Sequence, residues 1–123
     1  MIETESFFIS VLDEDTLKIV SKPNARMTYI EYDKLETFYR TLLPEKTKFK
    51  FLIILQEGFS LEKNPLDFIK HKIQLGYRHA EAYVIVSPIL RMFVNVGIKI
   101  YKNRHPVRMF ESEAQALKWL KDQ

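Results

Sequence analysis

Residues 82–102 read AYVIVSPILRMFVNVGIKIYK, and this stretch decides the fold. Its first five residues form an uninterrupted apolar run, which is typical of a strand buried on both faces. Ser87 and Pro88 then supply a capping side chain followed by proline at the first helical position, which predicts a helix start. We expect this helix to continue to Lys102. A buried strand joined directly to a helix is the building unit of an α/β fold with a parallel sheet.

The same alternation of strands and helices extends on both sides of this unit. Strands are expected at 7–12, 17–20, 49–55, 82–86 and 107–110, and helices at 28–43, 64–78, 88–102 and from Ser112 onward. An acidic turn separates the first two strands, which indicates an antiparallel hairpin. The order ββαβαβαβα predicts a single α/β domain over residues 1–123, with a mixed, mostly parallel sheet and helices packed on it.

Composition narrows the class of protein. The 123 residues are 46% hydrophobic, which is ample for one core, and the net charge of +3 is too small to predict a dedicated DNA or RNA binder. The chain has no cysteine, so disulfides and thiolate chemistry are excluded. The acidic start, residues 1–6, has neither the basic nor the apolar region of a signal peptide, and no apolar run is long enough to span a membrane. We expect a cytoplasmic protein.

Motifs for catalysis and cofactor binding are missing from the sequence. Three glycines cannot supply a glycine-rich phosphate loop, and no nucleophile elbow or dinucleotide fingerprint is present. His71 and His79 are too far apart on the expected helix to share one metal ion. The acidic turn at 13–15 lacks the spacing of a calcium loop. The sequence therefore predicts a protein that is not an enzyme and holds no metal or cofactor.

The helix expected at 88–102 is apolar on more sides than a surface helix needs. Its apolar residues cover roughly 240° of a helical wheel, whereas a stripe of about 100° is enough to cover a core. One stripe comprises Ile89, Met92, Phe93, Val96 and Ile100, and a second stripe beside it comprises Leu90, Val94, Ile98 and Tyr101. Three coverings for the second stripe stay open: a neighbouring part of the chain, a second copy in a homodimer, or a ligand in an apolar groove.

Polar groups at the two ends of this helix are candidates for an anion site and for partner docking. Ser87 begins the helix and Arg91 lies one turn along, an arrangement that suits a phosphate or carboxylate as well as an ordinary cap. Cations gather at the other end, where they suit a helix C-terminus and also offer a docking patch for an acidic partner, anionic lipid headgroups or nucleic acid. These cations are Lys99, Lys102, Arg104 and Arg108, with His105 beside them.

The second half of the chain resembles a known family. Its pattern is a strand ending in Ser-Pro, an arginine shortly into the next helix, a basic turn, a Pro-x-Arg-x-Phe strand and a last helix ending in a Trp-Leu pair. The residues that carry the pattern are Ser87, Pro88, Arg91, Lys99, Pro106, Arg108, Phe110, Ala116, Leu117, Trp119 and Leu120. From about Ala82 onward the chain is similar to small bacterial STAS-like (SpoIIAA-like) proteins, divergent relatives of the anti-sigma-factor antagonists.

This resemblance implies a sheet of four or five strands with helices on it, and a binding module that docks a partner protein. In typical antagonists a serine after the central strand, in an Asp-Ser-Ser/Thr-Gly setting, is phosphorylated by a partner kinase. Ser60 occupies roughly this region, although residues 56–61 read QEGFSL and lack that setting. Ser60 is therefore a candidate phosphosite only by its position.

Two functions follow as hypotheses. The first is a non-catalytic binding or regulatory module that contacts a partner protein, or a second copy of itself, through helix 88–102. The alternative is a carrier of a small amphipathic anion or lipid in an apolar groove beside that helix, with Arg91 holding the anionic group.

Overall fold

A computed structural model describes residues 1–62, 67, 78–101 and 105–123 of the 123-residue chain. The side chains of Glu36, Ile100 and Tyr101 are outside this description. Most of the helix predicted at 64–78 falls outside the described residues. Its predicted last residue, Arg78, instead opens a strand.

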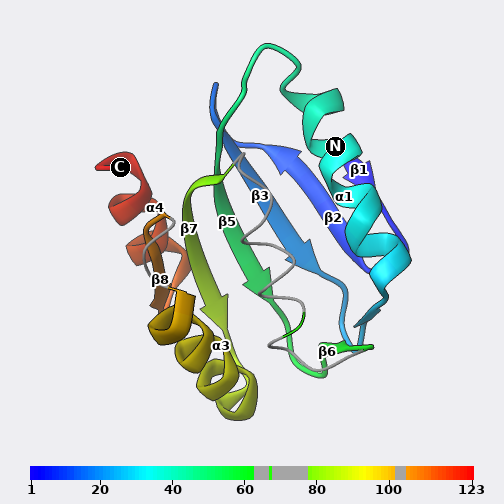
Figure 1. Cartoon of the computed structure of the whole chain (residues 1–123), viewed down its shortest axis with the longest axis vertical. Helices are drawn as coiled ribbons and strands as arrows, with labels where there is room; N and C mark the ends of the chain where they lie inside the picture. The colour runs from blue at the N-terminus through cyan, green and yellow to red at the C-terminus, as the bar shows by residue number, and fades with distance from the viewer. Residues whose placement is uncertain (63–66, 68–77, 102–104) are drawn as a thin grey trace.

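A mixed, mostly parallel sheet of six strands forms the centre of the fold (Figure 1). In spatial order the strands are β1 (Ile2–Glu3), β2 (Phe7–Val11), β3 (Thr16–Ser21), β5 (Phe49–Leu55), β7 (Arg78–Ile85) and β8 (Val107–Phe110). The first three strands pair antiparallel, and β3, β5, β7 and β8 pair in parallel. The predicted sheet type and the opening hairpin are both confirmed.

A second, two-stranded ladder lies beyond the carboxyl ends of β3 and β5. It joins β4 (Arg26–Met27) to β6 (Ser60–Leu61) in parallel. Each of these strands has two residues, and so does β1, which is too short for a hydrophobic period to show in the sequence. Asn24 and Gly58, in the turns that lead into the ladder, both have positive φ, at 59° and 79°.

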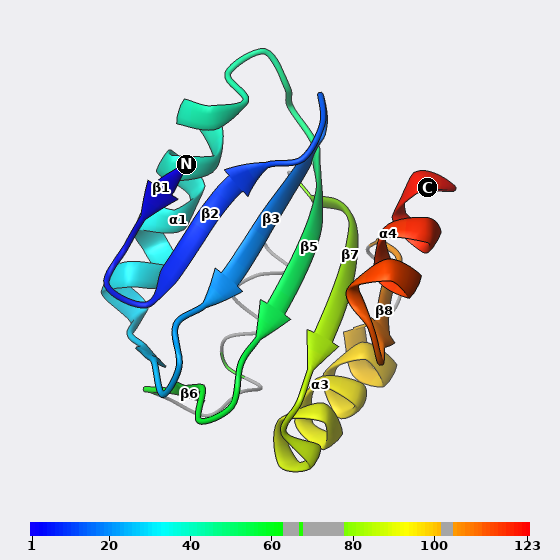
Figure 2. The same cartoon turned by 180° about the vertical axis from the view of Figure 1, so that it is seen from behind.

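Helices cover both faces of the sheet, as Figures 1 and 2 show from opposite sides. Helix α1 (Tyr29–Leu42) begins at the cap Thr28, whose Oγ1 accepts a hydrogen bond from the N–H of Glu31. Helix α4 (Glu113–Lys121) begins at the cap Ser112, whose Oγ accepts from the N–H of Gln115. Both starts match the sequence prediction within one residue.

The alternating side chains of the strands divide the core into two clusters, one on each face. The front cluster joins Phe49, Phe51 and Ile53 of β5 to Leu35 and Tyr39 of α1. The back cluster joins the side chains of β5 and β7 that point to the opposite face to helix α4. Its buried members are Leu52, Ala80, Ala82, Ala116 and Leu120. The third described helix, α3 (Pro88–Tyr101), follows β7 directly and contacts β7 and β8. It therefore lies toward one edge of the sheet.

Candidate functional site

Helix α3 turns one apolar side to the core and leaves another in solvent, but in the reverse of the order we expected. Leu90 is 9% exposed and belongs to the front core cluster, and Val94 packs against the same cluster. Ile89, Met92 and Val96 are 67%, 58% and 41% exposed. At these two positions the described covering is the front core cluster, which is a neighbouring part of the chain, and Val94 is half-buried against it.

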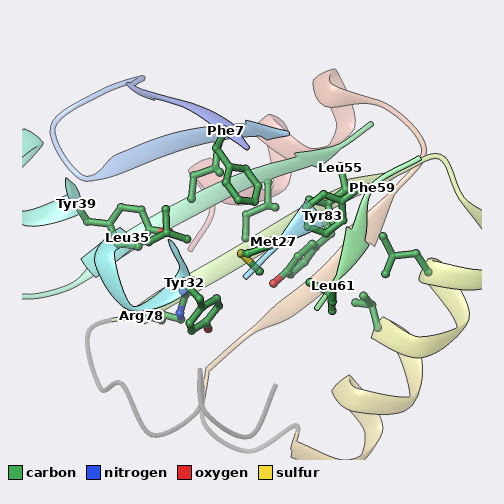
Figure 3. Close-up of a pocket in the computed structure, with 14 residues that line it drawn as sticks. Phe7, Met27, Tyr32, Leu35, Tyr39, Leu55, Phe59, Leu61, Arg78 and Tyr83 are labelled. Carbon is green, nitrogen blue, oxygen red and sulfur yellow. The ribbon is translucent and has the colours of Figure 1, made fainter. Parts of the chain in front are cut away.

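The core-facing side of α3 borders an apolar cavity of about 100 Å³, which we call the inner cavity (Figure 3). Leu90 and Val94 form its α3 wall. The other described residues that line it come from the front of the sheet, from α1 and from the β4–β6 ladder: Phe7, Ile19, Met27, Tyr32, Leu35, Tyr39, Ile53, Leu55, Phe59, Leu61, Arg78 and Tyr83. Binding of a ligand beside Leu90 and Val94 stays a prediction.

The solvent-facing side of α3 borders a second hollow, which we call the outer groove. It has a volume of about 570 Å³ and lies between α3 and the end of β8. Met92 and Val96 of α3 face Met109 and Phe110 across it. Its remaining described lining residues are Pro88, Arg91, Asn95, Lys99 and Glu111. This surface combines an apolar floor with charged groups at its border.

Arg91 lines the outer groove, whereas Leu90 and Val94 line the inner cavity. The carrier hypothesis requires Arg91 and the apolar stripe to meet in one pocket, and α3 separates them. Among the described lining residues, Arg91 and this stripe therefore do not share one hollow.

The other candidate residues on and near α3 are placed separately. Ser87 acts as a helix cap, since its Oγ accepts a hydrogen bond from the N–H of Leu90 at 3.3 Å. Lys99 lines the outer groove, and the guanidinium of Arg108 lies 5.4 Å from the centre of the Phe110 ring. Ile98 is half-buried. The side chain of Tyr101 and the predicted cations Lys102 and Arg104 lie outside the described residues.

Ser60 lies in β6, after the central strand β5, as the resemblance implies. Its N–H donates to the carbonyl oxygen of Ala25 at 2.9 Å, and its side chain is half-buried. The residue thus belongs to the β4–β6 ladder. Its phosphorylation stays a prediction.

A buried polar cluster that we did not predict lies beneath the inner cavity. Its centre is Glu81 of β7, whose side chain is 0% exposed. The carboxylate accepts from Arg78 Nη1 at 2.6 Å and from the hydroxyl of Tyr83 at 3.4 Å. Its other oxygen lies 2.7 Å from Nε2 of His105, in the segment before β8. The sequence places His105 beside the basic cluster at the end of helix 88–102, whereas in the structure its side chain is largely buried against Glu81.

An irregularity in strand pairing explains how Arg78 reaches Glu81. Residues three apart in a regular strand point to opposite faces. Phe49 pairs with Arg78 whereas Lys50 pairs with Ala80, so that His79 is an extra, bulged residue. The bulge rotates Arg78 onto the face that carries Glu81 and Tyr83. The guanidinium then lies 4.4 Å from the centre of the Phe51 ring.

Burial and the nearby Glu81 charge raise the pKa of Tyr83 well above its ordinary value, with Arg78 acting in the opposite direction. Tyr83 is therefore a neutral hydrogen-bond donor at physiological pH. The cluster pairs its carboxylate with a cation, which stabilises a buried charge rather than exposing a reactive one. Among the described residues no three metal-binding side chains come together. One signal of this cluster was present in the sequence: Glu81 directly precedes the apolar run expected as a strand at 82–86.

The six-stranded mixed sheet with helices on both faces defines an α/β protein with a SpoIIAA-like fold. A solved structure shows the same fold: an uncharacterized protein of the DUF3478 family with a SpoIIAA-like fold, from Shewanella loihica PV-4. It superposes with a TM-score of 0.64 over 98% of each chain, at 16% sequence identity. The chain belongs to the family described as a domain of unknown function, DUF7793, whose sequence model matches residues 10–123.

No curated protein matches the sequence. Within the described part of the chain, none of the helices has both the length and the apolar character needed to cross a membrane.

Proposed function

We propose that this protein is a non-catalytic binding module that docks an acidic, amphipathic helix of a partner protein in the outer groove. The observation that carries the proposal is the exposed apolar side of α3. Met92 and Val96 are exposed there, with Arg91 and Lys99 on the same groove. An apolar centre with a charged border is the usual anatomy of a protein interface.

The groove favours a helical partner. It runs beside a helix of 14 residues and is walled on its other side by Met109 and Phe110. Amphipathic helices bind such grooves through apolar side chains spaced three or four residues apart. Methionine on both walls suits this mode, because its unbranched side chain adapts to a partner's shape.

Charge favours an acidic partner over a second copy of the chain. Arg91 and Lys99 border the groove together with a single described carboxylate, Glu111, and Arg108 is exposed on the adjacent strand. A two-fold dimer through this face would bring each copy's cations toward those of the other. Like charges placed together in an interface oppose association, whereas acidic groups at the border of a partner helix would pair with these cations.

Selection of helical peptides from a displayed library tests the proposal directly. Peptides enriched on the wild-type protein should alternate apolar residues at helical spacing with Asp or Glu, and should lose binding to Met92→Asp and to Val96→Asp. Ile30→Asp is the matched control, because Ile30 is an equally apolar, 70% exposed residue on α1, far along the chain from the groove. Enriched peptides that are basic, or that bind Val96→Asp unchanged, would contradict the proposal.

The oligomeric state of the protein shows whether a partner protein or a second copy of the chain occupies the outer groove. We expect light scattering coupled to size exclusion to show a monomer at low and high salt. A dimer that persists in high salt and dissociates in Val96→Asp would mean that a second copy occupies the groove.

A further inference from the structure

The inner cavity has the size and chemistry of a binding site for a small molecule. Its volume is about 100 Å³, several times the space that one water molecule needs. Protein interiors are close-packed, and voids larger than a water molecule are few in each domain. A space of this size, lined by side chains of the front of the sheet, the β4–β6 ladder, α1 and α3, therefore has room for a group that the described part of the chain does not supply (Figure 3).

The described part of the lining is mostly apolar, which makes water an unfavourable occupant. Thirteen of the fourteen described lining residues have apolar or aromatic side chains. A water molecule needs two to four polar partners, and cavities lined by Leu, Ile and Phe stay dry. The hydroxyl of Tyr83 already donates to Glu81 at 3.4 Å, so it adds little to the polarity of this space.

The described part of the lining also disfavours an anion. The single charged side chain at the cavity is Arg78, among the residues described there, and its guanidinium is paired with the buried carboxylate of Glu81 at 2.6 Å. The pair has no net charge to offer a ligand. An ionised ligand would lose its hydration without gaining a counter-charge.

Aromatic side chains supply much of the wall. Phe7 and Phe59 already pack against each other at 5.7 Å between ring centres, with their planes tilted by 55°. Tyr83, Tyr32 and Tyr39 add three further rings. Offset or tilted ring contacts are worth more than the apolar area they bury, which favours a planar ring over an aliphatic chain of equal volume.

We propose that the inner cavity binds a small, uncharged aromatic molecule of about the size of one ring, held between Leu90 and Val94 of α3 and the aromatic residues of the sheet and α1. The site is separate from the outer groove, since α3 presents Val94 to the cavity and Val96 to the groove. Its ligand needs no cation and no metal ion.

Benzene and benzoate form the pair of probes that tests this site. Benzene at increasing concentration should raise the melting temperature of the full chain and shift the methyl resonances of Leu90 and Val94, because a ligand that binds only the folded state stabilises it. Benzoate at the same concentrations should do neither. No response to benzene, or an equal response to benzoate, would overturn the proposal.

Variants at two positions of one helix provide the control. Val94→Phe fills the cavity and should weaken benzene binding at least tenfold, whereas Val96→Phe adds the same ring on the exposed side and should leave it unchanged. If Val94→Phe fails to fold, Val94→Ala serves instead: the enlarged cavity should retain benzene and gain binding of the larger indole. Benzene binding that is the same in a folded Val94→Phe protein as in the wild type would contradict the site. Loss of peptide binding in Val96→Asp tests the groove alone, so the two proposals can fail separately.

Discussion

Arg78 and Glu81 form an ion pair in the interior of the protein, with 2.6 Å between Nη1 and Oε1. Their side chains are 4% and 0% exposed. The pair exists because β7 contains one extra residue, which places two side chains three positions apart on the same face of the sheet. His105 closes the other side of the carboxylate at 2.7 Å. Strand β7 is thereby tied to the segment that leads into β8.

Removing one member of this pair should destabilise the protein strongly. Glu81→Leu leaves Arg78 as an uncompensated buried charge, which costs about 3–5 kcal/mol of unfolding free energy. In the double variant Arg78→Met, Glu81→Leu both charges are replaced by apolar groups, and most of the loss should be recovered. Urea denaturation followed by circular dichroism measures both values. If the double variant were as unstable as Glu81→Leu or less stable, the pair would not be coupled.

The buried tyrosine predicts a loss of stability at alkaline pH. The pKa of Tyr83 is raised in the folded protein above its ordinary value of 10.0, because burial and Glu81 disfavour the phenolate. Because the pKa of Tyr83 is higher in the folded protein, the unfolded chain releases the phenol proton first as the pH rises. The stabilisation is therefore complete below pH 10 and decreases from there through the folded-state pKa. Tyr83→Phe removes this contribution. Denaturation curves at pH 8 and pH 11 should show a smaller alkaline loss in Tyr83→Phe than in the wild type, and an equal loss would show that other groups cause it.

A close approach of two turns predicts that Gly58 tolerates no side chain. Gly58 has a φ of 79°, which L residues rarely adopt, and an added Cβ would overlap Oδ1 of Asn24 and lie 2.9 Å from its Cγ. Gly58→Ala should therefore lower the unfolding free energy by more than the about 1–2 kcal/mol expected for the left-handed conformation alone. Asn24→Gly, at a φ of 59°, removes the overlapping side chain and should restore part of the loss in the double variant. Thermal unfolding of the four proteins tests this, and no recovery in the double variant would show that the backbone conformation accounts for the whole effect.

The cap of α4 should contribute measurably to stability. Ser112 Oγ accepts from the N–H of Gln115 at 3.2 Å, and Ser112→Ala should cost about 1 kcal/mol. Ser112→Asp keeps an acceptor at the helix start and is the matched control. The fluorescence of Trp119, which is the one tryptophan of the chain and lies 5.6 Å from the ring centre of Phe110, reports on the docking of α4. Equal unfolding midpoints for Ser112→Ala and the wild type would mean that the cap is replaced by water.

Much of the fold was predictable because local signals and apolar runs agree. The run 49–55 is a strand with the predicted bounds, and the cap-plus-proline pair at Ser87 and Pro88 does begin a helix. The short strands β4 and β6 were not predictable, since two residues hold no period and their pairing depends on two turns that are distant in sequence.

The face of α3 was not predictable for a different reason. A helical wheel gives the angle between two apolar stripes but does not say which one meets the sheet. That choice depends on where α3 lies, and it packs toward the β7–β8 edge, where only part of its apolar surface finds a partner among the described elements. Similarly, a period of two places Arg78 and Glu81 on opposite faces, and only the bulge at His79 brings them together.

The back of the sheet has a consequence for synthesis of the chain. Leu52 and Ala82 lie on strands that leave the ribosome before β8 and α4, yet Ala116 and Leu120 of α4 are what cover them (Figure 2). Exposed apolar surface on a growing chain is prone to aggregation. Until residues 107–121 emerge, this surface is open to chaperones, and a slow translation step before β8 would prolong that exposure.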